Sequence, residues 1–178
     1  ELKGQKIAVT RGTDPHIFLV RTLAGAGLTE KDVKLVLLQH ADGRTALERG
    51  DVEAWAGLDP IMASAEVESG ARLFYRKAAD NTWGVLNVRE EFARDYPDVV
   101  KRVLATYEKA RQWSLANPKE LSKSLIEATK LSEVVIAKQL ERTELTHGPI
   151  GTTQSDTIIA AGLALQEAGV VKADVDIK

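Results

Sequence analysis

The hydrophobic pattern in the first half of the chain alternates short apolar runs with stretches whose apolar residues recur every three or four positions. Short apolar runs bounded by polar or glycine-containing segments are typical of buried strands, and the longer spacing is typical of helices. This alternation favours right-handed crossover connections and a mostly parallel sheet. The expected strands are residues 6–10, 33–38, 52–57, 71–75 and 83–88.

Signals for the start of a helix lie between these strands. A side-chain oxygen just before the first turn, or a proline at the first position, is typical of a helix start, and glycine is typical of its end. The first two helices are expected to end at Gly27 and Gly50. The expected starts are Thr13 or Asp14 with Pro15, then Asp42, then Asp59 with Pro60.

The second half of the chain is predicted to be helical, because its apolar residues keep helical spacing and several polar or proline residues precede them. Asn117 to Glu120 matches a capping box with proline at the first helical position. The expected starts are Glu90, Pro97, Pro118, Ser132 and Ser155. A polar stretch at residues 78–82 separates the halves. It predicts an α/β lobe, residues 1–80, and a return strand with C-terminal helices, residues 81–178.

Composition narrows the class of function. The chain has 178 residues, with 44% hydrophobic and 28% charged, which indicates a globular protein. A net charge of -2 argues against nucleic acid as a partner. There is no Cys, and His40 and His147 lack the spacing of metal ligands. No catalytic residue, metal or cofactor is therefore expected. The start at Glu1, without Met, fits a mature secreted protein or a fragment.

The segment that follows the first expected strand is the leading candidate for a binding site. Gly12 permits close approach of the backbone to a ligand, and the amides of the following helix end favour an anion. Thr13 and His16 add donors, and Arg11 adds positive charge. Asp14 opposes an anion unless its carboxylate points away as a cap. The alternative is an ordinary capped helix after a strand.

Two further segments carry candidate ligand contacts. Trp55 could stack on an apolar part of a ligand or pack in the core, and Asp59 could face a ligand or only cap a helix. Asn81 and Trp83 place amide and indole donors close together in the chain. The alternative for this last pair is a polar connector with one aromatic residue packed beneath it.

The order of these motifs resembles one protein family along essentially the whole chain. The opening residues 2–9 resemble the start of the second lobe in type II periplasmic binding proteins of ABC importers. Several segments are similar to the aliphatic-sulfonate-binding subfamily: residues 11–16 with Leu19, Arg21 and Leu23, then 41–44 with Ala46, 50–56 and 59–60. The later segments 87–92, 96–97, 99–100, 169–171 and 175–177 resemble the family's return strand, helix and C-terminal end.

The resemblance implies a binding protein and not an enzyme. It implies an α/β, type II periplasmic-binding-protein fold, a small anion such as taurine or another alkanesulfonate as ligand, and an ABC permease in the inner membrane as partner. Gly12, Thr13 and His16 would bind the sulfonate, and the cleft would be lined by Trp55, Asp59, Asn81 and Trp83. The protein would be periplasmic, or exported and lipid-anchored.

The resemblance also implies that the N-terminal part of lobe one is missing, and with it half of the ligand cleft. Exposed apolar surface is therefore expected on the return helices. The same fold binding nitrate, bicarbonate or a pyrimidine precursor is an alternative. An enzyme on this scaffold is a remote one, because it would need a reactive cluster of His, Cys or Lys.

Overall fold

The computed structural model describes residues 2–177, and its internal contacts divide them into two units. The first unit contains residues 2–83 and 150–177, and the second contains Gly84–Pro149. The second unit is therefore an insertion in the sequence of the first.

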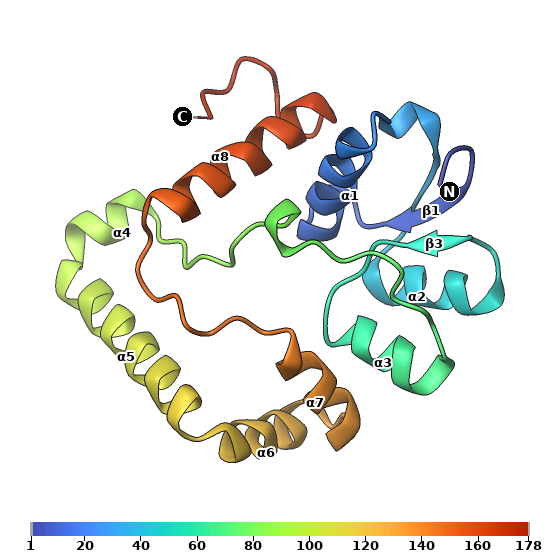
Figure 1. Cartoon of the computed structure of the whole chain (residues 1–178). Helices are drawn as coiled ribbons and strands as arrows, with labels where there is room; N and C mark the ends of the chain where they lie inside the picture. The colour runs from blue at the N-terminus through green and yellow to red at the C-terminus, as the bar shows by residue number, and fades with distance from the viewer. Residues whose placement is uncertain (1, 178) are drawn as a thin grey trace. The chain divides into compact units, whose positions relative to one another are not determined.

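A three-stranded parallel sheet is the centre of the first unit (Figure 1). Its strands are β1 (Lys6–Val9), β2 (Lys34–Leu37) and β3 (Ala54–Trp55), in the spatial order β2-β1-β3. Helix α1 (Asp14–Gly25) and the short 3-10 helix η1 (Glu30–Asp32) connect β1 to β2, and α2 (His40–Arg49) connects β2 to β3. From β1 the chain passes to β2 on one side of β1, and it then crosses to β3 on the other side.

Apolar side chains cover both faces of this sheet, because successive strand residues point to opposite sides. Ile7 and Val9 pack on one face with Leu19 and Leu23 of α1. Ala8 packs on the other face with residues of α2. The second cluster contains Ala8, Ala46 and Val52, with Val36, Leu38, Leu47 and Trp55 packed against it. Helices α1 and α2 thus lie on opposite faces of the sheet.

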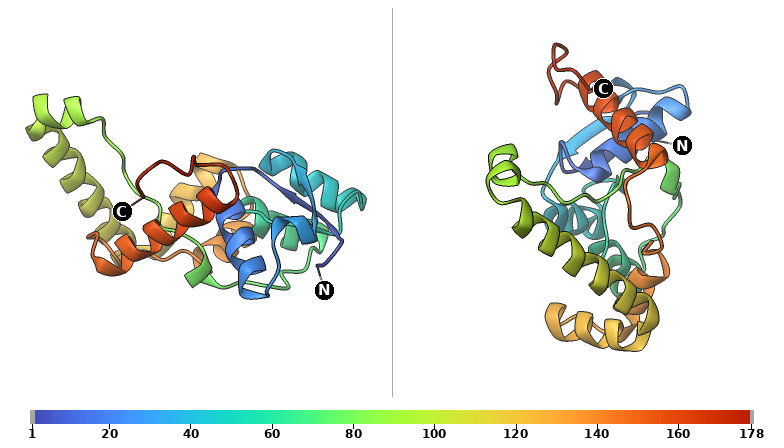
Figure 2. Two further views of the ribbon diagram at one scale, coloured as in Figure 1. Left: turned by 90° about the horizontal axis from the view of Figure 1, so that it is seen from above. Right: turned by 90° about the vertical axis from the view of Figure 1, so that its left-hand side faces the viewer.

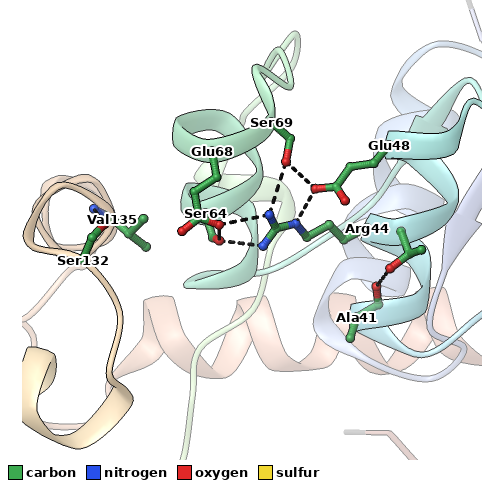
Figure 3. Close-up of polar contacts among 9 residues, drawn as sticks. Ala41, Arg44, Glu48, Ser64, Glu68, Ser69, Ser132 and Val135 are labelled. Carbon is green, nitrogen blue, oxygen red and sulfur yellow. Dashed lines mark hydrogen bonds and ion pairs between the residues drawn. The ribbon is translucent and has the colours of Figure 1, made fainter.

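Helix α3 (Ile61–Ser69) follows β3 and is tied to α2 by the side chain of Arg44 (Figure 3). The guanidinium of Arg44 donates to Glu48 at 2.6 Å on its own helix, and to Ser64 at 2.6 Å and Glu68 at 3.0 Å on α3. Hydrogen bonds from Ser69 and Arg44 lower the pKa of Glu48, and those from Ser64 and Arg44 lower the pKa of Glu68. This polar cluster fixes the position of α3 beside α2.

The C-terminal residues complete the first unit. Helix α8 (Thr152–Glu167) lies beside α1, as Figures 1 and 2 show, and buries Ala161 and Ala164. The 3-10 helix η2 (Ala78–Asp80) also contacts α1. Nearby, the rings of Phe18 and Tyr75 lie 5.8 Å apart. Helix α1 is therefore packed between the sheet and elements from much later in the chain.

The second unit is a chain of helices: α4 (Glu90–Asp95), α5 (Pro97–Ala116), α6 (Pro118–Thr129) and α7 (Glu133–Glu141). Each packs against the next, and Val135 and Ile136 of α7 are fully buried. Arg111 of α5 donates to the carbonyl of Leu145 at 2.8 Å and to Glu108 at 2.7 Å. It thereby holds the segment after α7 against α5.

The first three expected strands and the helical second half are confirmed. The expected strands at 71–75 and 83–88 are wrong, because neither segment pairs with another strand among residues 2–177. A strand needs a hydrogen-bonding neighbour, whatever its side-chain pattern. The expected cap at Asp42 is also wrong, since α2 begins at His40 after Gln39. The expected capping box at Asn117 is absent from α6.

Large apolar side chains are exposed on the second unit, which confirms the expectation for the return helices. They include Val103, Leu104, Tyr107 and Trp113 of α5, each 45% exposed or more. Leu86 and Val88 of the extended segment before α4 are 51% exposed. Single exposed apolar residues are ordinary, whereas several on one short helical unit indicate a surface suited to an interaction.

Candidate anion-binding site

The carboxyl ends of the three parallel strands lie at one edge of the sheet. There β1 leads into residues 10–13, β2 into residues 38–39 and β3 into residues 56–60. The hydroxyl of Thr10 joins two of these segments, because it donates to the carbonyl of Leu38 at 2.7 Å and lies 3.2 Å from Nδ1 of His40. In open parallel sheets, ligands bind at this edge, where successive connections leave in opposite directions.

The start of α1 offers unpaired backbone amides at this edge. Gly12 adopts a φ of 77°, a left-handed conformation that glycine tolerates and that turns the chain into the helix. The carbonyl of Thr13 accepts the first helical hydrogen bonds, from His16 at 2.9 Å and Ile17 at 3.0 Å. Within residues 2–177, the amides of Thr13 and Asp14 donate to no other residue. A helix end of this kind carries partial positive charge and favours an anion.

The start of α2 lies at the same edge. The amide of Gly43 donates to Gln39 at 2.8 Å, so the helical ladder begins there. The three preceding amides, those of His40, Ala41 and Asp42, have no acceptor in the described part of the chain. Sequence reasoning missed this second helix end, because it took Asp42 as the cap. The sequence gives no separate signal for this helix start, because Gln39 before α2 makes no side-chain cap.

The side chains of Arg11 and Thr13 are engaged with the backbone. Nη2 of Arg11 donates to the carbonyl of Ala168 at 2.7 Å, next to the end of α8. Oγ1 of Thr13 donates to the carbonyl of Thr10 at 2.6 Å and does not cap α1. Both residues therefore shape the turn, and the direct ligand contacts expected of them stay predictions.

The imidazole of His16 is fully buried beneath this turn. Its Nδ1 accepts a hydrogen bond from the amide of Gly12 at 3.0 Å, and its Nε2 lies 2.7 Å from Oε1 of Glu30. Both ring nitrogens are thus occupied by the protein in this structure. The role of His16 as a direct sulfonate donor stays a prediction that the geometry does not favour.

Trp55 lies where β3 ends, on the face that α2 covers. Its indole packs over two glycines: a methyl group built on Gly43 would lie 2.7 Å from Nε1, and one built on Gly57 would lie 2.5 Å from Cζ2. The ring is only half-buried and belongs to the edge of the α2 cluster. Trp55 therefore packs against the core cluster of α2 and still keeps part of its surface exposed.

The other three candidate residues occupy different positions. Oδ1 of Asp59 accepts from the amide of Ala63 at 2.9 Å, so its carboxylate acts at the start of α3. Asn81 is exposed, and its carbonyl accepts from Arg21 of α1 at 3.0 Å. Trp83 is half-buried. The structure thus gathers Arg11 to His16 at the start of α1, with Trp55 at the end of β3 and Asp59 after it, and leaves Asn81 beside a later turn of α1.

A surface hollow of about 220 Å³ is lined by residues of α1, of η1 and of the end of α8. Its lining includes Val20, Leu28, Glu30 and Glu167, none of which follows a strand. Its two carboxylates outnumber its one cation, Lys31, which disfavours an anion. Within residues 2–177 there is also no group of three His, Cys, Asp or Glu side chains arranged for a metal ion. In the same part of the chain, no helix is both long and apolar enough to cross a membrane.

Comparison with known proteins gives the chain a family. A family model described as NMT1/THI5 like matches residues 1–121. Two curated relatives are named for aliphatic sulfonate binding. The one from Bacillus subtilis is 30% identical over 162 residues, which are 90% of this chain and 48% of the relative. The one from Escherichia coli is 30% identical over 172 residues, 94% of this chain and 51% of the relative.

Solved structures confirm the expected periplasmic-binding-protein fold. The periplasmic aliphatic sulphonate binding protein SsuA from Escherichia coli matches with a TM-score of 0.81 and 29% identity, over 99% of this chain and 58% of that one. The alkanesulfonate-binding protein SsuA from Xanthomonas axonopodis pv. citri, bound to MOPS, matches with a TM-score of 0.82 and 24% identity, over 98% and 61%. The chain spans about half the length of the curated relatives it matches.

Proposed function

The chain belongs to the NMT1/THI5-like family, and from that premise we propose that it binds an aliphatic sulfonate at the helix ends beside β1. It does so as part of the substrate-binding component of an ABC importer. The observation that carries this proposal is the pair of helix N-termini, α1 and α2, whose first amides have no acceptor within residues 2–177.

The chemistry of a sulfonate suits these amides. The head group is a permanent anion with three acceptor oxygens, so it requires several donors and no proton transfer. Amide donors from Thr13 and Asp14, with those of His40 and its neighbours, supply them without a full positive charge. Hydrogen bonds to a charged acceptor are roughly twice as strong as neutral ones. A helix end also adds its dipole to each of these contacts.

Trp55 provides a surface for the alkyl tail. Its indole packs against Gly43 and Gly57, and the residue is only partly buried. Its Nε1 donates to no other residue in the described part of the chain, so the ring offers both an apolar face and one donor. An aliphatic tail needs only such an apolar wall, whereas the head group decides orientation. Asp59, Asn81 and Trp83 complete the proposed lining.

Relatives named for binding support a role without catalysis in the periplasm, and we propose a membrane permease as the partner. We further propose that a part of the two-lobed fold outside residues 1–178, the N-terminal part of lobe one, covers the exposed apolar residues of the second unit. Support comes from the 58% of the Escherichia coli SsuA chain that this chain matches, and from the exposed Leu86, Val88, Leu104 and Tyr107. That additional part would supply the rest of the ligand cleft.

A calorimetric titration with linear sulfonates from methanesulfonate to butanesulfonate tests the function. Each methylene buried against Trp55 should strengthen binding about four-fold, from about 0.8 kcal/mol per buried methylene. Trp55→Ala should keep methanesulfonate binding and lose most of the increment per methylene. Dimethyl sulfone, which is neutral, is the matched control ligand and should not bind. Binding of the neutral control without binding of any sulfonate would overturn the proposal.

A further inference from the structure

The two hydrogen bonds of His16 fix its protonation state. A backbone amide can only donate, so Nδ1, which accepts from Gly12 at 3.0 Å, carries no proton. The ring proton is therefore on Nε2, which donates to Oε1 of Glu30 at 2.7 Å. The ring is fully buried, whereas the Glu30 side chain is 22% exposed and so keeps some contact with solvent. Glu30 thus selects the tautomer whose free nitrogen faces the turn.

Gly12 is the residue at which the chain turns into α1. Its φ of 77° is held by the bond from its own amide to the ring four residues later. The next two amides are those of Thr13 and Asp14, the unpaired donors of the proposed site. Since the Gly12 amide already has an acceptor in the protein, it is not a donor to a ligand. The Gly12 amide instead holds the turn that positions the amides of Thr13 and Asp14, the proposed donors to the ligand.

We infer that His16 is a positioning residue for the anion site: it holds the Gly12 turn through Nδ1, with Glu30 fixing its tautomer, and does not touch the ligand. This inference rests on the proposed function for the identity of the anion. It changes the role of His16 from a direct donor to a buried support. Its consequence is a pH dependence opposite in sign to that of a direct contact.

The sign follows from the proton that Nδ1 would take up in acid. An imidazolium that touched a sulfonate would strengthen binding as the pH falls. Here, a proton on Nδ1 removes the acceptor of the Gly12 amide and loosens the turn, so binding weakens. The charged groups on the neighbouring elements are Glu30, Lys31 and Asp32 of η1, Arg11 and Asp14 beside the turn, and Glu167 of α8. Only Glu30 among them has a hydrogen bond to the ring.

Two substitutions test the roles of the two ring nitrogens of His16 separately. In His16→Asn the amide oxygen replaces Nδ1 as acceptor for Gly12, whereas in His16→Gln the amide replaces Nε2 and leaves Gly12 without an acceptor. We expect His16→Asn to bind methanesulfonate within about three-fold of wild type. We expect His16→Gln to bind about ten-fold or more weakly, because a buried amide is then unsatisfied. Glu30→Ala removes the carboxylate that accepts from Nε2, so either ring tautomer can form. Binding should weaken less in this variant than in His16→Gln.

The test combines nitrogen NMR with the titration, on the full chain. NMR should show Nδ1 unprotonated and Nε2 protonated in wild type, and the Gly12 amide signal should shift in His16→Gln and little in His16→Asn. Methanesulfonate affinity should fall in acid for wild type and stay level for His16→Asn. Affinity that rises in acid through His16, or equal loss in both variants with an unchanged Gly12 signal, would overturn the inference. If no sulfonate binds, the proposed function fails, and the NMR result still decides the role of His16.

Discussion

The contact between Gly43 and Trp55 yields a quantitative prediction for the substitution Gly43→Ala. Gly43 is a buried residue of α2, and its added methyl group would lie 2.7 Å from Nε1 and 2.8 Å from Cδ1 of Trp55. Real methyl groups do not approach other atoms so closely, so the indole or the helix must move. Overpacking of this kind costs about 1–3 kcal/mol.

The same substitution also has a favourable effect. Alanine in a helix interior is about 1 kcal/mol more stable than glycine. The sum of the two effects for Gly43→Ala is a loss of about 0–2 kcal/mol in the free energy of unfolding. A chain of this size shifts its melting temperature by about 2–4 °C per kcal/mol, so a decrease of a few degrees is expected. Affinity for butanesulfonate should fall as well, because Trp55 forms the proposed wall for the alkyl tail.

Urea unfolding followed by far-ultraviolet circular dichroism measures this effect in a double-mutant cycle. In a Trp55→Ala background the clash is absent, so Gly43→Ala should stabilise the chain by about 1 kcal/mol. The coupling between the two sites should equal the overpacking cost, about 1–3 kcal/mol. Gly25→Ala is the matched control, because a methyl group there meets nothing within 4 Å. A coupling near zero would show that the indole does not lie over Gly43.

Two further predictions concern polar clusters. Arg44→Lys keeps the charge but loses the planar fork between α2 and α3, so amide hydrogen exchange should speed up in α3 and remain unchanged in Arg49→Lys. Hydrogen bonds from Arg111 and Gln112 lower the pKa of Glu108 from 4.5 to about 2. Because the folded pKa is the lower one, the stability contribution of Glu108 is present above pH 4.5 and lost as the pH falls to about 2. The difference in urea stability between wild type and Glu108→Gln should therefore vanish at about pH 2, and a constant difference would refute this explanation.

Local sequence signals predicted the elements that the chain itself pairs. The run at residues 6–10 became β1 because its apolar residues are buried between two neighbours, and the Gly50 stop of α2 has the expected left-handed conformation. Residues 71–75 have an equally strong apolar pattern but find no partner strand within residues 2–177. Pairing is a long-range property that an apolar run does not specify.

The turn after β1 and the helix start beside it were predicted, but the contacts of their side chains were not. The turn after β1 was found because its glycine and its helix start are local signals. The burial of His16 beneath that turn was not predictable, because it depends on Glu30, fourteen residues later in the chain. The orientation of Trp55 likewise depends on Gly43 and Gly57, whose missing side chains make room for the ring. Glycines contribute little to a hydrophobic pattern, so the pattern does not predict where a large ring packs.

The interrupted sequence of the first unit has a consequence for biosynthesis. Residues 150–177 belong to the same body as β1, so a ribosome must translate all of the second unit before α8 can cover α1. Until then, the nascent chain exposes the surface that will contact Ala161 and Ala164, and Arg11 lacks the carbonyl of Ala168. A chain that ends at about residue 149 would leave α1 uncovered by α8. Chaperones and proteases would then meet an incompletely folded first unit.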